Sequence, residues 1–260
     1  MADRVSREGP STDVSAATGS HPRPAFYAAR SGRAGDWWTL LHPPYTAWHL
    51  SYVVVGASLA PHATVGRLLA TLAAFFLAVG LAAHALDELN GRPLGTRIST
   101  AALVVTTVVG LGGAVALGVA GLSRVGWVLV PFLVIGPVLV LAYDLELFGG
   151  LLHNDVGFAL AWGSFPLLVG YVAESRTLAP SALVAAGAAF ALSLAQRRLS
   201  TPARTLRRRV ADVEGRVTHR DGSVTALDRR ALLAPLEGAL RALSWAVVLV
   251  AAALAVARFT

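Results

Sequence analysis

The sequence predicts an all-α protein, a polytopic membrane bundle of about seven transmembrane helices. Three observations lead to this fold class. Hydrophobic residues make up 55% of the 260 residues, charged residues only 14%, and the mean hydropathy is +0.61. Apolar stretches long enough to cross a hydrocarbon core of about 30 Å recur along the chain. All 22 basic residues are arginines, and they lie beside these stretches. That placement favours membrane topology over nucleic-acid binding.

Three of the predicted spans contain residues that indicate how the helix packs. The first contains His49, which we expect to be a polar packing residue. The third has Gly110, Ala114 and Gly118 at four-residue spacing, which permits close helix approach. In the fifth, Pro166 predicts a kink. The seven spans are residues 45–61, 65–87, 98–121, 124–144, 156–173, 178–196 and 238–258.

Composition divides the chain into four regions. They are a disordered cytoplasmic tail (1–36), a bundle of six spans (37–200), an arginine-rich cytoplasmic segment (201–237) and a last transmembrane helix (238–260). Aromatic residues at the start of the bundle predict an interfacial belt of Trp37, Trp38, Tyr45 and Trp48.

The cytoplasmic segment carries signals of its own. Val217 and Val224 flank Asp221-Gly222, which predicts a β-hairpin. Asp228 is a candidate N-cap for the helix that leads into the last span. There is no cysteine, so disulfides and thiolate chemistry are excluded.

The arginines predict the orientation of the chain in the cell membrane. If the N-terminus is cytoplasmic and the spans alternate, eighteen arginines lie inside. The four outside are Arg67, Arg124, Arg176 and Arg258. The positive-inside rule therefore favours a cytoplasmic N-terminus and an outside C-terminus.

Carboxylates stand at the ends of two predicted spans that both run toward the cytoplasm. The second span ends with His84, Asp87 and Glu88, whose spacing puts them on one helix face. The fourth ends with Tyr143, Asp144 and Glu146. A carboxylate at a helix C-terminus costs about 0.3–1 kcal/mol because the helix dipole is negative there.

These carboxylates need a positive partner, and the residues leave two candidates. One is the arginine-rich segment 197–209. The other is a divalent cation: oxygen ligands suit Mg²⁺, which substrate phosphates complete, whereas His84 and His153 suit a transition metal. A purely structural alternative is that the carboxylates form surface ion pairs with Arg92, Arg97 and the arginines at 207–209.

The stretch AHALDELNGRPLGTRIS resembles the first aspartate-rich segment of the UbiA family of intramembrane prenyltransferases. Asp87 matches the second aspartate of the family pattern, and Arg92-Pro93 matches its Arg-Pro. Ala83, His84 and Gly91 replace the asparagine and the first and third aspartates. Tyr143 matches a tyrosine that the family often has near its fourth span, and the resemblance covers roughly residues 37–200. Directly after the sixth span, where the second aspartate motif of the family would stand, the chain has no acidic residue, and Asp212 with Glu214 is a candidate for a displaced counterpart.

The resemblance implies a transferase that moves an alkyl group other than methyl, from a polyprenyl diphosphate to a membrane-soluble acceptor. Magnesium would assist departure of the diphosphate, and membrane lipid would surround the bundle. Asp87 and Glu88 would be catalytic. The residues that would bind diphosphate are Arg92, Arg97, Tyr143, Arg207 and Arg208. The metal ligands would be His84, Asp87, Glu88, Asp144 and Glu146.

Two other functions remain open. The chain can be a non-catalytic membrane protein that keeps the prenyltransferase fold as a partner or scaffold. It can also be a metal or cation transporter, although spans 3, 5 and 6 contain almost none of the acidic or histidine residues that such a pathway needs.

Overall fold

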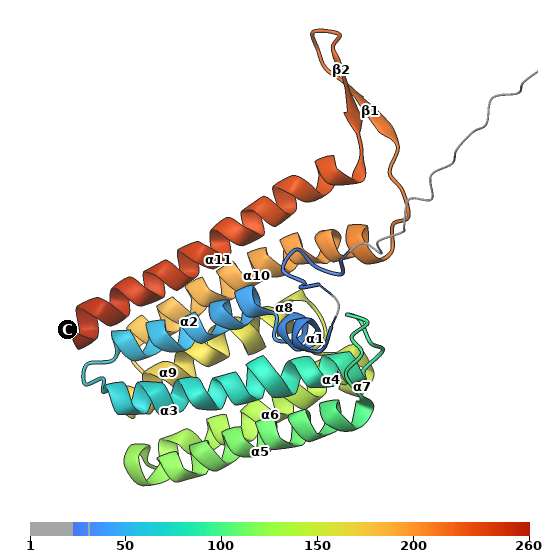
Figure 1. The fold of residues 1–260 in the computed structure, drawn as a ribbon. Helices are drawn as coiled ribbons and strands as arrows, with labels where there is room; N and C mark the ends of the chain where they lie inside the picture. The colour runs from blue at the N-terminus through green and yellow to red at the C-terminus, as the bar shows by residue number, and fades with distance from the viewer. Residues whose placement is uncertain (1–22, 31) are drawn as a thin grey trace, which may run out of the picture.

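A computed structural model describes residues 23–30 and 32–260. Five helical segments are long and apolar enough to cross a membrane, which indicates an integral membrane protein. They are Val65–Leu89, Thr100–Val125, Trp127–Asp144, Asp155–Ser175 and Arg229–Phe259. Helix α2 (Pro43–Leu59) and helix α10 (Pro180–Arg208) run beside them in the same bundle (Figure 1).

Several of these segments consist of more than one helical element. Val65–Leu89 contains α3 (Val65–Phe75), the π-helix η1 (Phe76–Ala83) and α4 (His84–Leu89). Trp127–Asp144 contains the 3₁₀ turn η2 (Trp127–Leu129) and α6 (Val130–Asp144). Asp155–Ser175 contains α8 (Asp155–Ala159), the π-helix η3 (Leu160–Ser164) and α9 (Phe165–Ser175). The remaining helices are α1 (Arg33–Leu40), α5 (Thr100–Val125), α7 (Leu147–Gly150) and α11 (Arg229–Phe259).

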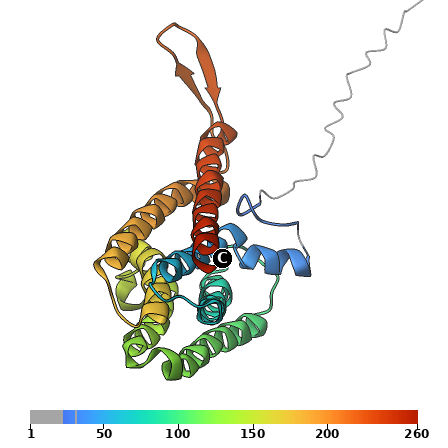
Figure 2. The same cartoon turned by 90° about the vertical axis from the view of Figure 1, so that its left-hand side faces the viewer.

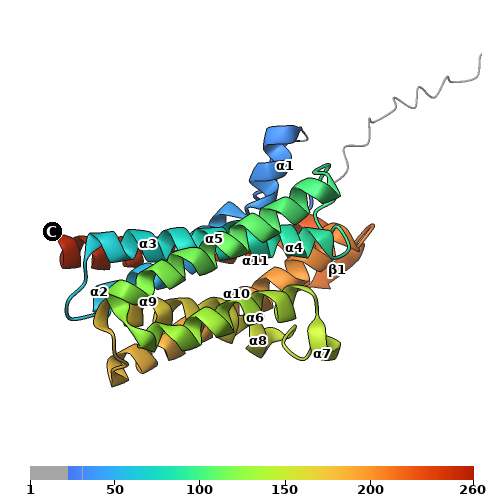
Figure 3. The same cartoon turned by 90° about the horizontal axis from the view of Figure 1, so that it is seen from below.

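The two ends of the bundle differ in what they carry. The C-terminus and the connection 60–64 lie at one end, at the left of Figure 1. Helices α4 and α7 and the base of the hairpin lie at the other. Seen end-on, α11 packs on the side of α2 and α10, while α5 and α6 form the opposite edge (Figure 2). Helix α1 projects sideways from the bundle (Figure 3).

The observed bounds differ most from the predicted spans at α10 and α11. Helix α10 continues past residue 196 to Arg208, and α11 begins at Arg229, directly after the predicted cap Asp228, and runs without a break through the predicted last span. Hydropathy identifies only the apolar part of a helix, whereas polar residues extend it by packing on other elements. Helix α2 begins at Pro43, because proline is well suited to the first helical turn, where its missing N–H is not needed.

Glycines bring α2 and α9 into close contact. A Cβ added at Gly56 would overlap the carbonyl oxygen of Leu167, and one at Gly170 would overlap that of Val53. Gly110 plays the same part on α5, where a Cβ would lie 2.6 Å from the Leu77 carbonyl oxygen of η1. The predicted close approach at Gly110 is therefore present, and α2 with α9 forms a second small-residue interface.

The chain before α1 packs on the bundle, although the predicted disordered tail includes it. Ala25 and Ala28 are buried, and the Phe26 ring lies 5.1 Å from the Arg241 guanidinium of α11. Aromatic side chains give this segment apolar surface that the overall polarity of 1–36 obscures. The predicted disorder of residues 1–22 lies outside the described residues.

The predicted aromatic belt is only partly at the surface. Trp38 is about half exposed, whereas Trp48 is completely buried and its Nε1–H donates to the Tyr52 hydroxyl at 2.5 Å. An indole can be fully buried when its N–H finds a partner. Trp48 therefore belongs to the core between α2 and the rest of the bundle.

The hairpin forms as the sequence predicts. Strands β1 (Gly215–Thr218) and β2 (Val224–Leu227) pair antiparallel, with Thr218 opposite Val224. Gly222 takes a positive φ of 83° in the turn, and Asp228 caps α11 by accepting from the Ala231 N–H at 2.7 Å. The hairpin extends away from the helices (Figures 1 and 2).

We expect Gly56→Val to lower the thermal unfolding midpoint of the purified protein in detergent. The added side chain forces α2 away from the Leu167 carbonyl, and such overpacking typically costs about 1–3 kcal/mol. Gly187→Val is the matched control, because Gly187 is exposed on α10 and a Cβ there meets no atom within 4 Å. Equal midpoints for the two variants would contradict close packing at Gly56.

Candidate functional site

A polar cavity of about 640 Å³ lies at the end of the bundle that carries α4 and α7. Its walls come from the N-terminal segment and α2, from η1 and α4, from the end of α6, from α8 with η3, and from α10. Helix α10 forms one wall and packs on α8, η3 and α11, whereas α4 and α6 together form another. The lining contains four arginines and three carboxylates.

Three of the predicted acidic residues line this cavity, namely Asp87, Asp144 and Glu146. Asp87 of α4 and Asp144 at the end of α6 both line it, as does Tyr143. Asp144 is only 7% exposed, and its Oδ2 has no hydrogen-bond partner among the described residues. The Tyr143 hydroxyl is buried and unpaired within the same part of the chain. The cavity therefore contains polar atoms that a ligand can satisfy.

Glu88 lies elsewhere, although its position beside Asp87 suggested a shared site. Its carboxylate is completely buried and accepts hydrogen bonds from the backbone N–H groups of Leu94 and Thr96, at 2.9 and 2.8 Å. The Thr96 hydroxyl donates to it as well, at 2.8 Å. Glu88 thus organises the connection between α4 and α5 and is not available to a metal or a substrate.

Four of the five predicted metal ligands line the cavity, but they are not arranged as a metal-binding set; the four are His84, Asp87, Asp144 and Glu146. No group of three or more His, Asp or Glu side chains among residues 23–30 and 32–260 is arranged to hold a metal ion. His84 stacks on His42 with ring centroids 4.3 Å apart, and its Nδ1 lies 3.2 Å from the Gly80 carbonyl. The Glu146 side chain is more than half exposed, 3.9 Å from His153. This donor set does not fit the magnesium site that the resemblance implies.

The predicted phosphate-binding arginines separate into two groups. Arg92 donates to the Ile98 carbonyl at 2.6 Å, and the backbone N–H of Arg97 donates to Asp36 at 3.2 Å. Arg207 is ion-paired with Glu237 of α11. These three do not line the cavity, whereas Arg208 does.

Helix α10 contributes three further arginines to the cavity: Arg197, Arg204 and Arg209. The sequence named the segment 197–209 as a source of positive charge, but not Arg204 as a binding residue. The signal that identifies it is the spacing of Arg197, Arg204 and Arg208, seven and four residues apart, which puts them on one helix face. That signal is visible only once α10 is extended beyond residue 196.

The N-terminal segment closes part of the cavity with neutral groups. Burial, with Tyr45 adding to it, raises the pKa of the Tyr27 hydroxyl above its ordinary range, so this group remains a neutral donor. Burial and the neighbouring His84 lower the pKa of His42 well below its ordinary range. Tyr27 and His42 therefore carry no charge at neutral pH, whereas the four arginines of the lining are positively charged.

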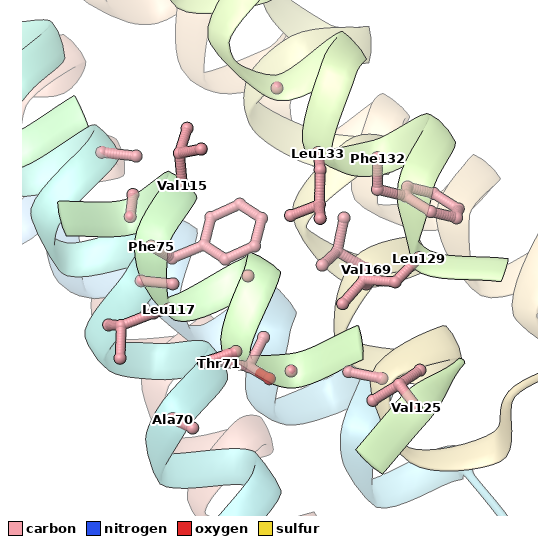
Figure 4. Close-up of a pocket in the computed structure, with 18 of the residues that line it drawn as sticks. Ala70, Thr71, Phe75, Val115, Leu117, Val125, Leu129, Phe132, Leu133 and Val169 are labelled. Carbon is pink, nitrogen blue, oxygen red and sulfur yellow. The ribbon is translucent and has the colours of Figure 1, made fainter. Parts of the chain in front are cut away.

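A second cavity of about 760 Å³ lies between α3, α5, α6 and α9, and its lining is mostly apolar (Figure 4). It extends from Thr64 and Arg67, near the opposite end of the bundle, to Val79 and Trp162. Val79 and Trp162 also line the polar cavity, so the two cavities adjoin there. Its volume is within the range of pockets that hold small organic ligands, about 300–1,000 Å³.

Both residues at this junction belong to π-helical segments, Val79 to η1 and Trp162 to η3. Pro166 explains how η3 is accommodated. It has no N–H to donate to the carbonyl four residues earlier, which is that of Trp162. The Trp162 carbonyl instead accepts from His49 Nδ1 of α2 at 2.7 Å. His49 is thus the polar packing residue that the sequence predicts, and the predicted kink near Pro166 takes the form of a π-helix.

Fold and cavities together define a helical membrane protein with a charged cavity at one end that adjoins an apolar cavity within the bundle. Comparisons with models of protein families, with curated proteins and with solved structures find no match to the chain.

We expect His49→Leu to destabilise the protein by about 1–3 kcal/mol, because the buried Trp162 carbonyl loses its hydrogen-bond partner. Thermal unfolding in detergent measures the effect, with His62→Leu on the exposed connection 60–64 as the control.

The same change is expected to cost less in a Pro166→Ala background. Alanine restores an N–H at position 166 that can bond the Trp162 carbonyl within the helix. Strictly additive effects in this double-mutant cycle would show that the two sites are not coupled through that carbonyl.

Proposed function

We propose that this protein is a UbiA-like intramembrane transferase that binds a polyprenyl diphosphate and transfers its prenyl group to a membrane-soluble acceptor. The observation that carries the proposal is the junction of the two cavities at Val79 and Trp162. An arginine-rich cavity that adjoins an apolar one suits an amphiphile with an anionic head and a hydrocarbon tail.

The proposed reaction breaks the bond between the first carbon of the prenyl chain and the diphosphate oxygen. The bonding electrons leave with the diphosphate, where guanidinium groups stabilise the charge that develops. The allylic cation that remains bonds to a nucleophilic atom of the acceptor, which loses a proton. Asp87 and Asp144 line the cavity, and either carboxylate can accept that proton.

We also propose seven membrane crossings, with α2 and α10 in addition to the five apolar segments. Arg67, Arg124, Arg176 and Arg258 all belong to the end that carries the connection 60–64 and the C-terminus. The other described arginines lie in the N-terminal segment and α1, in the loop 90–99, in the second half of α10 and directly after it, in the hairpin, and in the first half of α11. This asymmetry supports a cytoplasmic cavity and hairpin, with the C-terminus outside.

Cysteine labelling checks this orientation, because the chain contains no cysteine of its own. In intact cells, a membrane-impermeant maleimide is expected to label a C-terminal Thr260→Cys variant. A Ser223→Cys variant in the hairpin is expected to react only after the membrane is opened. Labelling of both variants in intact cells would contradict an odd number of crossings between them.

Purified protein, labelled geranylgeranyl diphosphate and a membrane lipid extract test the activity. We expect release of inorganic diphosphate together with transfer of the label to a lipid. Asp87→Asn is expected to lower the rate about tenfold or more, in the range that loss of a positioned proton acceptor produces. Asp212→Asn is the matched control, since Asp212 is exposed and does not line the cavity.

Two outcomes would revise the proposal. Activity that survives Asp87→Asn would remove that residue from the site. Tight binding of the diphosphate with neither release nor transfer, in a folded protein supplied with extract, would instead favour a non-catalytic protein that retains the binding cavity.

A further inference from the structure

The arginines of α10 differ in whether their charge is already balanced. Arg207 is bound by both carboxylate oxygens of Glu237, and Arg197 lies 3.5 Å from Asp155. Neither Arg204 nor Arg208 is in an ion pair within residues 23–30 and 32–260. Arg209, which follows the helix directly and also lines the cavity, has no ion pair among these residues either, so three guanidinium groups of the lining have no carboxylate partner there.

The hydrogen bonds of Arg204 and Arg208 leave most of their donors free. Arg204 Nη2 makes one long bond to the Thr201 hydroxyl, at 3.4 Å, and Arg208 Nε donates to the Pro24 carbonyl at 3.2 Å. A guanidinium group carries five N–H donors in a planar fork that matches the oxygens of a phosphate. Within the described part of the chain, no other protein acceptor bonds the remaining donors of Arg204 and Arg208.

The geometry of α10 presents these donors side by side. Arg204 and Arg208 are four residues apart, one turn of helix, which corresponds to about 6 Å along the axis. Arg197 lines the same cavity from the same helix face, but its charge is balanced by Asp155. Adjacent phosphoryl groups of a diphosphate are spaced closely enough for two such arginines to hold one each.

A second, independent feature points to a ligand. The hydroxyl of Tyr143, a residue only 5% exposed, lines the cavity and has no partner among the described residues. A phosphate oxygen in the cavity would accept from this hydroxyl. The donors thus come from two walls, α10 and the end of α6.

We infer that Arg204 and Arg208 of α10 hold the diphosphate head directly and that binding requires no divalent cation. This inference rests on the proposed function and deepens it. It accounts for the residues that line the cavity. The UbiA pattern supplies aspartates that bind magnesium, and this chain lacks several of them. Guanidinium groups provide the positive charge instead. Arginine binds phosphate bidentately without a metal bridge.

Binding of labelled geranylgeranyl diphosphate to the purified protein in detergent tests the inference, once with excess EDTA and once with MgCl₂. We expect equal affinity in the two conditions. Inorganic pyrophosphate is expected to compete, and geranylgeraniol, which has the tail alone, is expected to bind more weakly. Arg204→Gln and Arg208→Gln should each lower the affinity about tenfold or more, because each removes charge-assisted hydrogen bonds.

The control is Arg198→Gln, which removes an equal charge from an exposed position on the same helix outside the cavity. Its affinity is expected to equal that of the unaltered protein. Arg204→Lys keeps the charge but not the fork, and an intermediate affinity would support bidentate contact. A thermal midpoint close to that of the unaltered protein establishes that each variant is folded.

The remaining outcomes separate this inference from the proposed function. Binding that appears only with MgCl₂ would overturn the arginine site and leave the transferase proposal standing. Affinity that is unchanged in Arg204→Gln and Arg208→Gln, or equal for geranylgeraniol, would also overturn the arginine site. Absence of binding in both conditions would overturn the inference and the proposed function together.

Discussion

The hydrogen bond between His49 and the Trp162 carbonyl is the interaction on which the two cavities depend. Inside an apolar bundle, a carbonyl without a partner is costly, and Pro166 removes the N–H that would serve this one. His49 of α2 supplies a donor from another helix. The bond therefore ties α2 to η3 at the place where Trp162 separates the charged chamber from the apolar one.

The sequence predicts an element well where residues within it or directly beside it determine its structure. Asp221-Gly222 specifies the hairpin turn, Asp228 the cap of α11, and Gly110 a close helix contact. Hydropathy finds the apolar core of most spans. It misses roughly the last three turns of α10, because those residues are polar and are held in the helix by the N-terminal segment and α11.

At the candidate site, too, local sequence signals predict some neighbours, whereas contacts between distant parts of the chain decide others. Asp87, Asp144 and Tyr143 could be predicted as neighbours, because helices that run in the same direction end on the same side of the bundle. The direction of Glu88 could not, because it depends on the loop 90–99 folding back so that Leu94 and Thr96 donate to the carboxylate. The spacing of residues along a helix predicts which side chains share a face of the isolated helix. A loop that folds back can still bind one of those side chains, as the loop 90–99 binds Glu88.

The contact between the N-terminal segment and α10 helps to define the wall of the polar cavity. The Pro24 carbonyl accepts from Arg208, and Tyr27 lines the chamber a few residues further on. Residues 24–27 therefore form part of the wall of the polar cavity and also fix the direction of the Arg208 guanidinium group. An insertion or another change that shifts residues 24–27 will alter both the shape of the polar cavity and the direction of that guanidinium group.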